Sequence, residues 1–145
     1  MRIVSIAVSK KRGTRKLLVH EADLIQDHGI STDAHAGPWH RQVSFLASES
    51  LEKAQKQGFN VTFGDFAENI ATSGIDWKEM PIGARLTIGD SALIEVTQIG
   101  KVCHNRCAIY YSVGDCIMPR EGVFARVLKS GKIRVGDAIG IENGP

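Results

Sequence analysis

The feature that most constrains the fold is a pair of adjacent segments in which apolar and polar residues alternate. Residues 85–90 and 92–97 each show a period of two, and Gly89-Asp90 lies at their junction. Such alternation places successive side chains on opposite faces of a β-strand, and a Gly-Asp pair favours a tight reversal of the chain. These residues therefore predict a β-hairpin.

Other short segments also have the composition of β-strands and are bounded by turn-forming residues. They are residues 3–8, 17–19, 42–46, 133–135 and 138–141. We expect Gly13-Thr14 to form a turn, and the last two strands to flank a second turn at Gly136-Asp137. Residues 27–40 are rich in Gly, Asp, His, Ser and Thr, a composition typical of an ordered loop.

Two segments predict α-helices. Residues 48–57 form the clearer one, with Ser48 as the N-cap and Gly58 as the stop. The second would begin at Pro119 and end at Gly131. Its apolar residues at helical spacing are Val123, Phe124, Val127 and Leu128.

Many short strands and few helices predict a mainly β fold, namely a closed or partly closed β-barrel with a few peripheral α-helices. A chain of 145 residues has the length of one domain, and no repeat, low-complexity tract or linker divides it. We therefore expect residues 1–145 to form a single domain.

The charge balance argues against a nucleic-acid-binding protein. Lysine and arginine total 18 against 16 acidic residues, so the net charge is only +2, whereas nucleic-acid binders usually carry a strongly basic face. Basic residues do cluster near the N-terminus, where a solvated loop is the simplest interpretation and an anion-attracting rim is the alternative. They are Lys10, Lys11, Arg12, Arg15 and Lys16.

The sequence predicts a cytoplasmic protein with reduced thiols. Its first residues do not resemble a signal peptide, and no apolar run approaches the ~20 residues of a membrane-spanning helix. The three cysteines are an odd number, which argues against a disulfide framework.

The strongest candidate for chemistry is the segment of residues 101–107. Lys101, His104 and Arg106 would supply positive charge that favours the thiolate form of Cys103 and Cys107. A thiolate attacks sulfur or binds a soft metal, so the segment suits persulfide or metal chemistry. A structural zinc site that adds Cys116 is an alternative, although the spacing is a poor match to usual zinc ligands. Cys116 is equally well explained as a small buried residue.

Two further groups of polar residues are candidate ligand contacts. His35 and His40 lie on the predicted loop, beside Arg41, whose planar guanidinium suits phosphate or carboxylate. Glu68 and Asn69 stand among apolar residues. Surface hydrogen bonding would explain the histidines, and satisfaction of backbone groups would explain Glu68 and Asn69, without any ligand.

Taken in order, these motifs resemble those of the MOSC family, in particular its small, stand-alone bacterial members. Residues 33–37 with 40–44 resemble its first signature, and residues 66–70 with 74–76 resemble its Phe-Gly-Glu-Asn-Leu signature. The segment from Val96 to Cys107 is similar to the stretch that holds the family's cysteine, and residues 114–126 and 136–137 complete the match. Ala67 replaces the usual signature glycine, a change expected to have a small backbone consequence.

The resemblance implies a MOSC-type β-barrel that receives the molybdenum cofactor, a molybdopterin. It implies that His35, His40, Arg41, Glu68 and Asn69 bind the cofactor, with the basic residues Lys101 and Arg106. Cys103 or Cys107 would ligate molybdenum or carry a persulfide. Three residues separate these cysteines, whereas some relatives have two, so both stay candidates.

The leading hypothesis is a protein that binds the molybdenum cofactor and transfers or carries its sulfur through a reactive cysteine. No pyridoxal-phosphate domain is visible, so we do not expect the chain to extract sulfur from cysteine by itself. The alternatives are a molybdenum-dependent reductase of N-hydroxylated compounds with an electron partner, and a zinc-binding structural domain. The expected partners are the cofactor and its biosynthetic or acceptor proteins, with no nucleic acid or membrane. The sequence does not indicate an oligomeric state.

Overall fold

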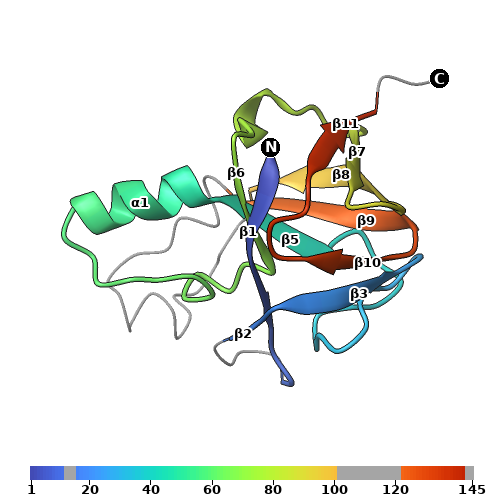
Figure 1. Ribbon diagram of the computed structural model, residues 1–145, viewed down its shortest axis with the longest axis horizontal. Helices are drawn as coiled ribbons and strands as arrows, with labels where there is room; N and C mark the ends of the chain where they lie inside the picture. Colours follow the sequence, from blue (N-terminus) through green and yellow to red (C-terminus); the bar gives the residue numbers. More distant parts are fainter. Residues whose placement is uncertain (12–15, 101–121, 143–145) are drawn as a thin grey trace.

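The computed structural model describes residues 1–11, 16–100 and 122–142, which form two β-sheets and one α-helix (Figure 1). The larger sheet has eight strands in the order β11-β7-β8-β9-β5-β6-β1-β2, and the smaller has the order β10-β3-β4. The elements are β1 (Arg2–Val8), β2 (Leu17–Val19), β3 (Glu21–Ile25), β4 (Gly29–Ile30), β5 (Val43–Ala47), α1 (Ser48–Lys56), β6 (Ile70–Ser73), the 3₁₀ turn η1 (Trp77–Glu79), β7 (Arg85–Ile88), β8 (Ala92–Ile99), β9 (Val123–Lys129), β10 (Gly131–Arg134) and β11 (Ile139–Ile141). The prediction of a mainly β chain is confirmed.

The predicted hairpin is present as β7 and β8, which pair antiparallel from Arg85–Glu95 to Ile88–Ala92. The strands predicted at residues 3–8, 17–19 and 42–46 correspond to β1, β2 and β5. The predicted loop of residues 27–40 is irregular except for the two-residue strand β4.

A β5–α1–β6 crossover places two segments of the chain side by side. β5 and β6 are parallel neighbours, with Phe45 opposite Ile70. Because parallel strands enter the sheet from the same edge, the residues that precede β5 and those that precede β6 meet there. In Figure 1, α1 projects to one side of the sheet.

Two apolar clusters make up the core. The larger is built from the strands and includes Phe45, Ile94 and the buried indole of Trp77. The smaller lies beneath α1 and contains Leu46, Leu51, Ala54, Val61, Phe66 and Phe124. Phe66 and Phe124 therefore connect the helix to the sheet surface on which the candidate site lies.

The helix predicted for residues 119–131 is wrong over its described part, because Val123–Lys129 is the strand β9. This strand lies between β5 and β8; Val123, Ala125 and Val127 are buried on one face, and Phe124 is buried on the other, where Arg126 is exposed. A strand with buried residues on both faces lacks simple alternation, so periodicity does not distinguish it from a helix. Pro119 lies outside the described residues.

Two smaller predictions also need correction. The N-cap of α1 is Ala47, which has no side-chain cap bond, and Ser48 is instead the first helical residue. The last two strands do not pair with each other, because β10 pairs with β3 and β11 pairs with β7. The chain passes from one sheet to the other through the turn at Gly136, whose φ is 96°.

Neither sheet is closed among the described residues, so a closed barrel is not confirmed. The larger sheet ends at β11 and β2, with an isolated bridge between Arg2 and Ala138 beside the start of β11. The described residues form a β-rich fold with one α-helix, whereas a few peripheral helices were expected.

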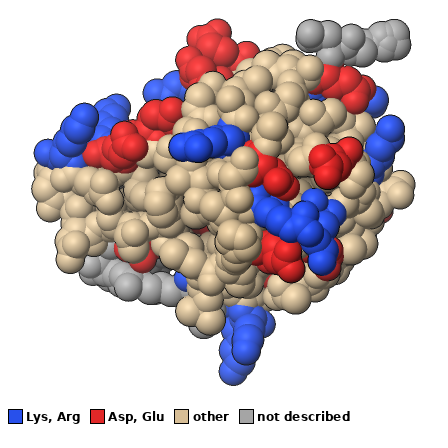
Figure 2. Space-filling view, viewed as in Figure 1, with Lys and Arg blue, Asp and Glu red and all other residues tan. Residues whose placement is uncertain are grey.

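The face shown in Figure 2 carries acidic and basic side chains interspersed, without an extended area of one sign. No helix among the described residues is long and apolar enough to cross a membrane.

Candidate functional site

A small pocket lies at the edge of the sheet where β5 and β6 begin. Its volume is about 90 Å³. It is lined by Lys16, His35, Trp39, Arg41, Ser44, Phe66, Ala67, Asn69 and Phe124. The structure thus brings together three residues singled out in the sequence, His35, Arg41 and Asn69.

Lys16 and Asp33 form a buried ion pair at the pocket. The Lys16 Nζ atom lies 2.8 Å from Asp33 Oδ1, and their side chains are 2% and 0% exposed. Burial opposes ionisation of Asp33, but the nearby His35 ring, whose Nδ1 atom lies 3.7 Å from Asp33 Oδ2, and the hydrogen bonds from Lys16 and the Ser9 amide outweigh this effect and hold the pKa of Asp33 far below its ordinary value. The interpretation of Lys16 as part of a solvated loop is therefore wrong.

His35 is tied to this pair and is only partly buried. Its Nδ1 atom lies 3.3 Å from Lys16 Nζ, and its backbone N–H donates to Asp33 Oδ2 at 3.2 Å. Its carbonyl oxygen accepts a bond from the Trp39 indole at 2.9 Å. Hydrogen bonds to Asp33 and from Trp39 thus fix the backbone of the loop at His35.

Arg41 precedes β5, and its guanidinium packs against two aromatic rings. Its guanidinium carbon is 4.9 Å from the centre of the Trp39 ring and 5.6 Å from that of Phe124. Such packing favours a cation electrostatically and restricts its rotation. The Nε atom is buried and has no hydrogen-bond partner in the described structure. A buried guanidinium donor without an acceptor is costly, so a ligand oxygen at this position would be stabilised.

Asn69 connects three strands. Its side-chain oxygen accepts the Ser44 N–H at 3.0 Å, and its side-chain nitrogen donates to the Ala7 carbonyl at 3.1 Å. Its backbone N–H donates to Ser44 Oγ at 2.9 Å. In the structure, Asn69 therefore satisfies backbone groups. It also lines the pocket, where a ligand could contact it.

Glu68 is buried beside this wall but does not line the pocket. Its Oε2 atom accepts the Gly64 N–H at 2.7 Å, whereas Oε1 is buried without a partner among the described residues. Burial raises the pKa of Glu68 above its ordinary value, although backbone hydrogen bonds act in the opposite direction. Glu68 therefore supports the loop before β6 rather than facing the space that a ligand would occupy.

Ala67 has a backbone conformation that normally favours glycine. Its φ is 63°, in the left-handed region, where the Cβ atom crowds the chain. This explains a glycine at the corresponding position of the Phe-Gly-Glu-Asn-Leu signature. The expectation of a small backbone consequence therefore understates the effect of alanine here.

The remaining predicted residues are not part of this pocket as described. His40 is exposed, with its Nε2 atom 3.0 Å from Gln98 Oε1. Lys101, Cys103, Arg106 and Cys107 lie outside the described residues, as do His104 and Cys116. No cluster of three or more His, Cys, Asp or Glu able to hold a metal ion occurs in the described part of the chain.

The sequence reasoning missed several lining residues, namely Lys16, Trp39, Ser44, Phe66 and Phe124. Ser44 and Phe66 stand inside the recognised motifs and Trp39 lies between the two parts of the first one, so their proximity to Arg41 and Asn69 in the sequence was a usable signal. Lys16 and Phe124 had none, because tertiary pairing alone brings them to the pocket.

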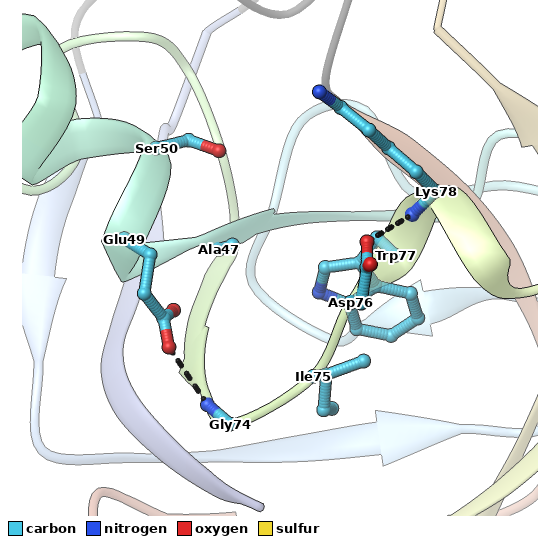
Figure 3. Close-up of a pocket in the computed structure, with 8 residues that line it drawn as sticks. All are labelled: Ala47, Glu49, Ser50, Gly74, Ile75, Asp76, Trp77 and Lys78. Carbon is cyan, nitrogen blue, oxygen red and sulfur yellow. Dashed lines mark hydrogen bonds between the residues drawn. The ribbon is translucent and has the colours of Figure 1, made fainter.

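A second, more open pocket of about 470 Å³ lies at the start of α1 (Figure 3). It is lined by Ala47, Glu49, Ser50, Gly74, Ile75, Asp76, Trp77 and Lys78. The Glu49 carboxylate accepts the Gly74 N–H at 3.0 Å, and Asp76 accepts the Lys78 N–H at 3.1 Å (Figure 3). Both carboxylates thus stabilise local backbone, and none of the predicted site residues lies here.

Comparison with known proteins identifies the family. The sequence matches no curated protein. The fold is similar to the YuaD protein of Bacillus subtilis, with a TM-score of 0.79 at 17% identity over 97% of this chain and 94% of that one. It is also similar to YiiM of Geobacillus stearothermophilus, with a TM-score of 0.71 at 21% identity, covering 98% of this chain and 75% of that one. YiiM of Escherichia coli gives 0.66 at 19% identity, covering 100% and 71%.

These likenesses concern the fold alone, because the identities are low. A family model of the MOSC domain matches residues 32–140, which is most of the chain and includes His35, Arg41, Asn69 and the cysteine segment. The protein whose pocket is described above therefore belongs to the MOSC domain family.

Proposed function

We propose that this MOSC protein binds the molybdenum cofactor and carries or transfers its sulfur through Cys103 or Cys107. The observation that carries the proposal is the buried Nε atom of Arg41, which lacks a partner and lies at a pocket together with Lys16 and His35. Asp33 neutralises Lys16, so Arg41 supplies the net positive charge that an anionic ligand would meet.

The pocket residues fit one part of the cofactor, its phosphate. A cavity of about 90 Å³ is much smaller than the roughly 300–1,000 Å³ of a typical small-molecule pocket, so it suits a compact phosphate group rather than the pterin. The planar donor fork of Arg41 is suited to phosphate oxygens. The aromatic rings of Trp39 and Phe124 would keep that fork in place.

The chemistry that the bound cofactor supplies is the redox and sulfur-ligand chemistry of molybdenum. The chain itself would supply the thiolate that carries sulfur. In a transfer from a donor persulfide, the thiolate bonds to the outer sulfur while the donor's S–S bond breaks, and the donor leaves as a thiolate. Atoms and electrons balance in this exchange, so no oxidant is required.

The test is to produce the protein in a host that makes the cofactor and to measure molybdenum, zinc and the fluorescence of the oxidised pterin. Molybdenum with pterin should be present in the wild type and lost in the Cys103→Ser/Cys107→Ser variant. Arg41→Met should weaken retention by about 10- to 100-fold, the loss of one charge-assisted contact. Arg134→Met is the matched control, because Arg134 pairs with Glu21 on the surface.

The alternatives give different results in the same experiment. Zinc alone would indicate the structural site of Cys103, His104, Cys107 and Cys116. Molybdenum with turnover of an N-hydroxylated substrate and a reductant would indicate the reductase. A persulfide on Cys103 or Cys107 by mass spectrometry, without stable molybdenum, would indicate sulfur carriage alone. If neither metal, pterin nor persulfide is found, the proposal is wrong.

A further inference from the structure

The ammonium group of Lys16 has three partners from three positions of the chain. Its Nζ atom lies 2.8 Å from Asp33 Oδ1, 3.3 Å from Ser9 Oγ and 3.3 Å from His35 Nδ1. An ammonium group has three N–H donors and no acceptor. Each of the three partners must therefore accept a hydrogen bond from Lys16.

This requirement determines where His35 carries its proton. A nitrogen that accepts a hydrogen bond has a free lone pair, so Nδ1 is unprotonated and the ring proton is on Nε2. The competing arrangement, with Nδ1–H donating to Asp33 Oδ2, spans 3.7 Å, which is too long for a hydrogen bond. It would also direct an N–H group towards the Lys16 ammonium.

The other ring nitrogen is available to the pocket. The His35 side chain lines the pocket and is 34% exposed. No residue in the described ranges hydrogen-bonds to its Nε2 atom. With Nδ1 held by Lys16, the ring has a fixed orientation, and its Nε2–H group is left as a donor on a residue that lines the same pocket as Arg41.

We propose that Lys16 is a positioning residue, which holds His35 as the Nε2–H tautomer so that His35 donates to an oxyanion bound beside Arg41. The identity of that oxyanion as the cofactor's phosphate rests on the proposed function, whereas the tautomer does not. The pocket then presents donors from two side chains to one tetrahedral anion, a phosphate monoester or an ion of the same shape.

The tautomer can be measured by NMR on ¹⁵N-labelled protein without any cofactor, because protonated and unprotonated ring nitrogens have well-separated chemical shifts. We expect the His35 Nε2 atom to be protonated and Nδ1 to be unprotonated. Protonation of Nδ1, alone or together with Nε2, would overturn the inference. This measurement on the wild-type protein is decisive even if a variant fails to fold.

Two variants and one probe test the role of Lys16. In Lys16→Met, the Nδ1–H form of His35 should appear, while the exposed His40 keeps its signals. Lys16→Arg restores donors and should restore the Nε2–H form. A Lys16→Met protein in which His35 remains wholly Nε2–H would show that Lys16 does not hold it.

Inorganic phosphate tests the donor role directly. It should shift the His35 Nε2–H signal but not the His40 signals, and should bind about 3- to 10-fold more weakly to Lys16→Met. Phosphate that leaves the His35 signal unchanged would refute the donor role. If the tautomer and the phosphate effect hold but no pterin is ever retained, the proposed function fails and the inference about Lys16 stands.

Discussion

Removal of one partner from the buried Lys16–Asp33 pair should destabilise the fold strongly. At the observed 2.8 Å, an effective dielectric constant of about 20 gives an attraction of roughly 6 kcal/mol. Desolvation of the two ions costs several kcal/mol each, so the pair as a whole contributes little net stability. Loss of one partner leaves the other charge buried and uncompensated, and we expect Lys16→Met and Asp33→Asn each to lose about 3–5 kcal/mol of unfolding free energy.

Urea unfolding followed by circular dichroism and by the fluorescence of Trp39 and Trp77 measures these values. The double variant Lys16→Met/Asp33→Asn should lose about 2 kcal/mol less than the sum of the single losses, because it leaves no lone charge. Lys132→Met is the control, since Lys132 and Glu21 form a half-exposed pair 3.9 Å apart, worth at most about 0.5 kcal/mol. Single variants within about 1 kcal/mol of the wild type, with additive effects, would refute the reasoning.

The pair also predicts the direction of acid destabilisation. The folded state lowers the pKa of Asp33, so its contribution is present above the ordinary aspartate value of about 4 and is lost as the pH falls below it. Removal of Lys16 removes one cause of that lowering. In Lys16→Met the acid-induced loss attributable to Asp33 should therefore be smaller and be complete at a higher pH than in the wild type, as acid titrations of both proteins would show.

Three further changes have defined outcomes. Ala67→Gly should stabilise the protein by about 1 kcal/mol, because glycine relieves the left-handed backbone; a loss of stability in urea unfolding would contradict this. Because the fold raises the pKa of Glu68, ionisation of this carboxyl opposes folding once the pH rises above its ordinary pKa of about 4.3. The unfolding free energy of Glu68→Gln relative to the wild type should therefore increase between about pH 3 and pH 7, and a difference that does not change with pH would contradict this. Gln42→Leu should cost about 1–3 kcal/mol, since it removes the buried acceptor of the Val127 N–H within β9, and an unchanged denaturation midpoint would exclude that role.

The parts of the fold that the sequence predicted are those decided by local contacts. The hairpin of residues 85–97 combines alternation with a Gly-Asp turn, and both signals lie within the segment itself. Phe124 was assigned to a helix because the apolar residues of β9 do not alternate simply with polar ones, and the position of β9 in the sheet depends on β5 and β8, neighbours that no local pattern reveals. Partner strands, rather than intrinsic propensity, decide such a segment.

The residues of the candidate site likewise fall into those that sequence motifs reveal and those that only tertiary contacts bring to the pocket. His35, Arg41 and Asn69 were found because they stand in recognised motifs, and the parallel pairing of β5 and β6 brings them together. Lys16 was missed because its partner Asp33 lies 17 positions away in the sequence. The lysine can be buried only because the fold brings this carboxylate next to it. Glu68 shared a motif with Asn69, yet its side chain turns to the Gly64 amide instead of the pocket.

The central position of β9 has a consequence for when the pocket can exist. β5 lacks its neighbour on one side, and Arg41 lacks the Phe124 ring, until residues 123–129 have been synthesised. A nascent chain still attached to the ribosome at β8 therefore has no complete wall on which to hold a ligand. Loading of this pocket must follow translation of β9, and ribosome-bound chains halted before Val123 should fail to retain whatever the finished protein binds.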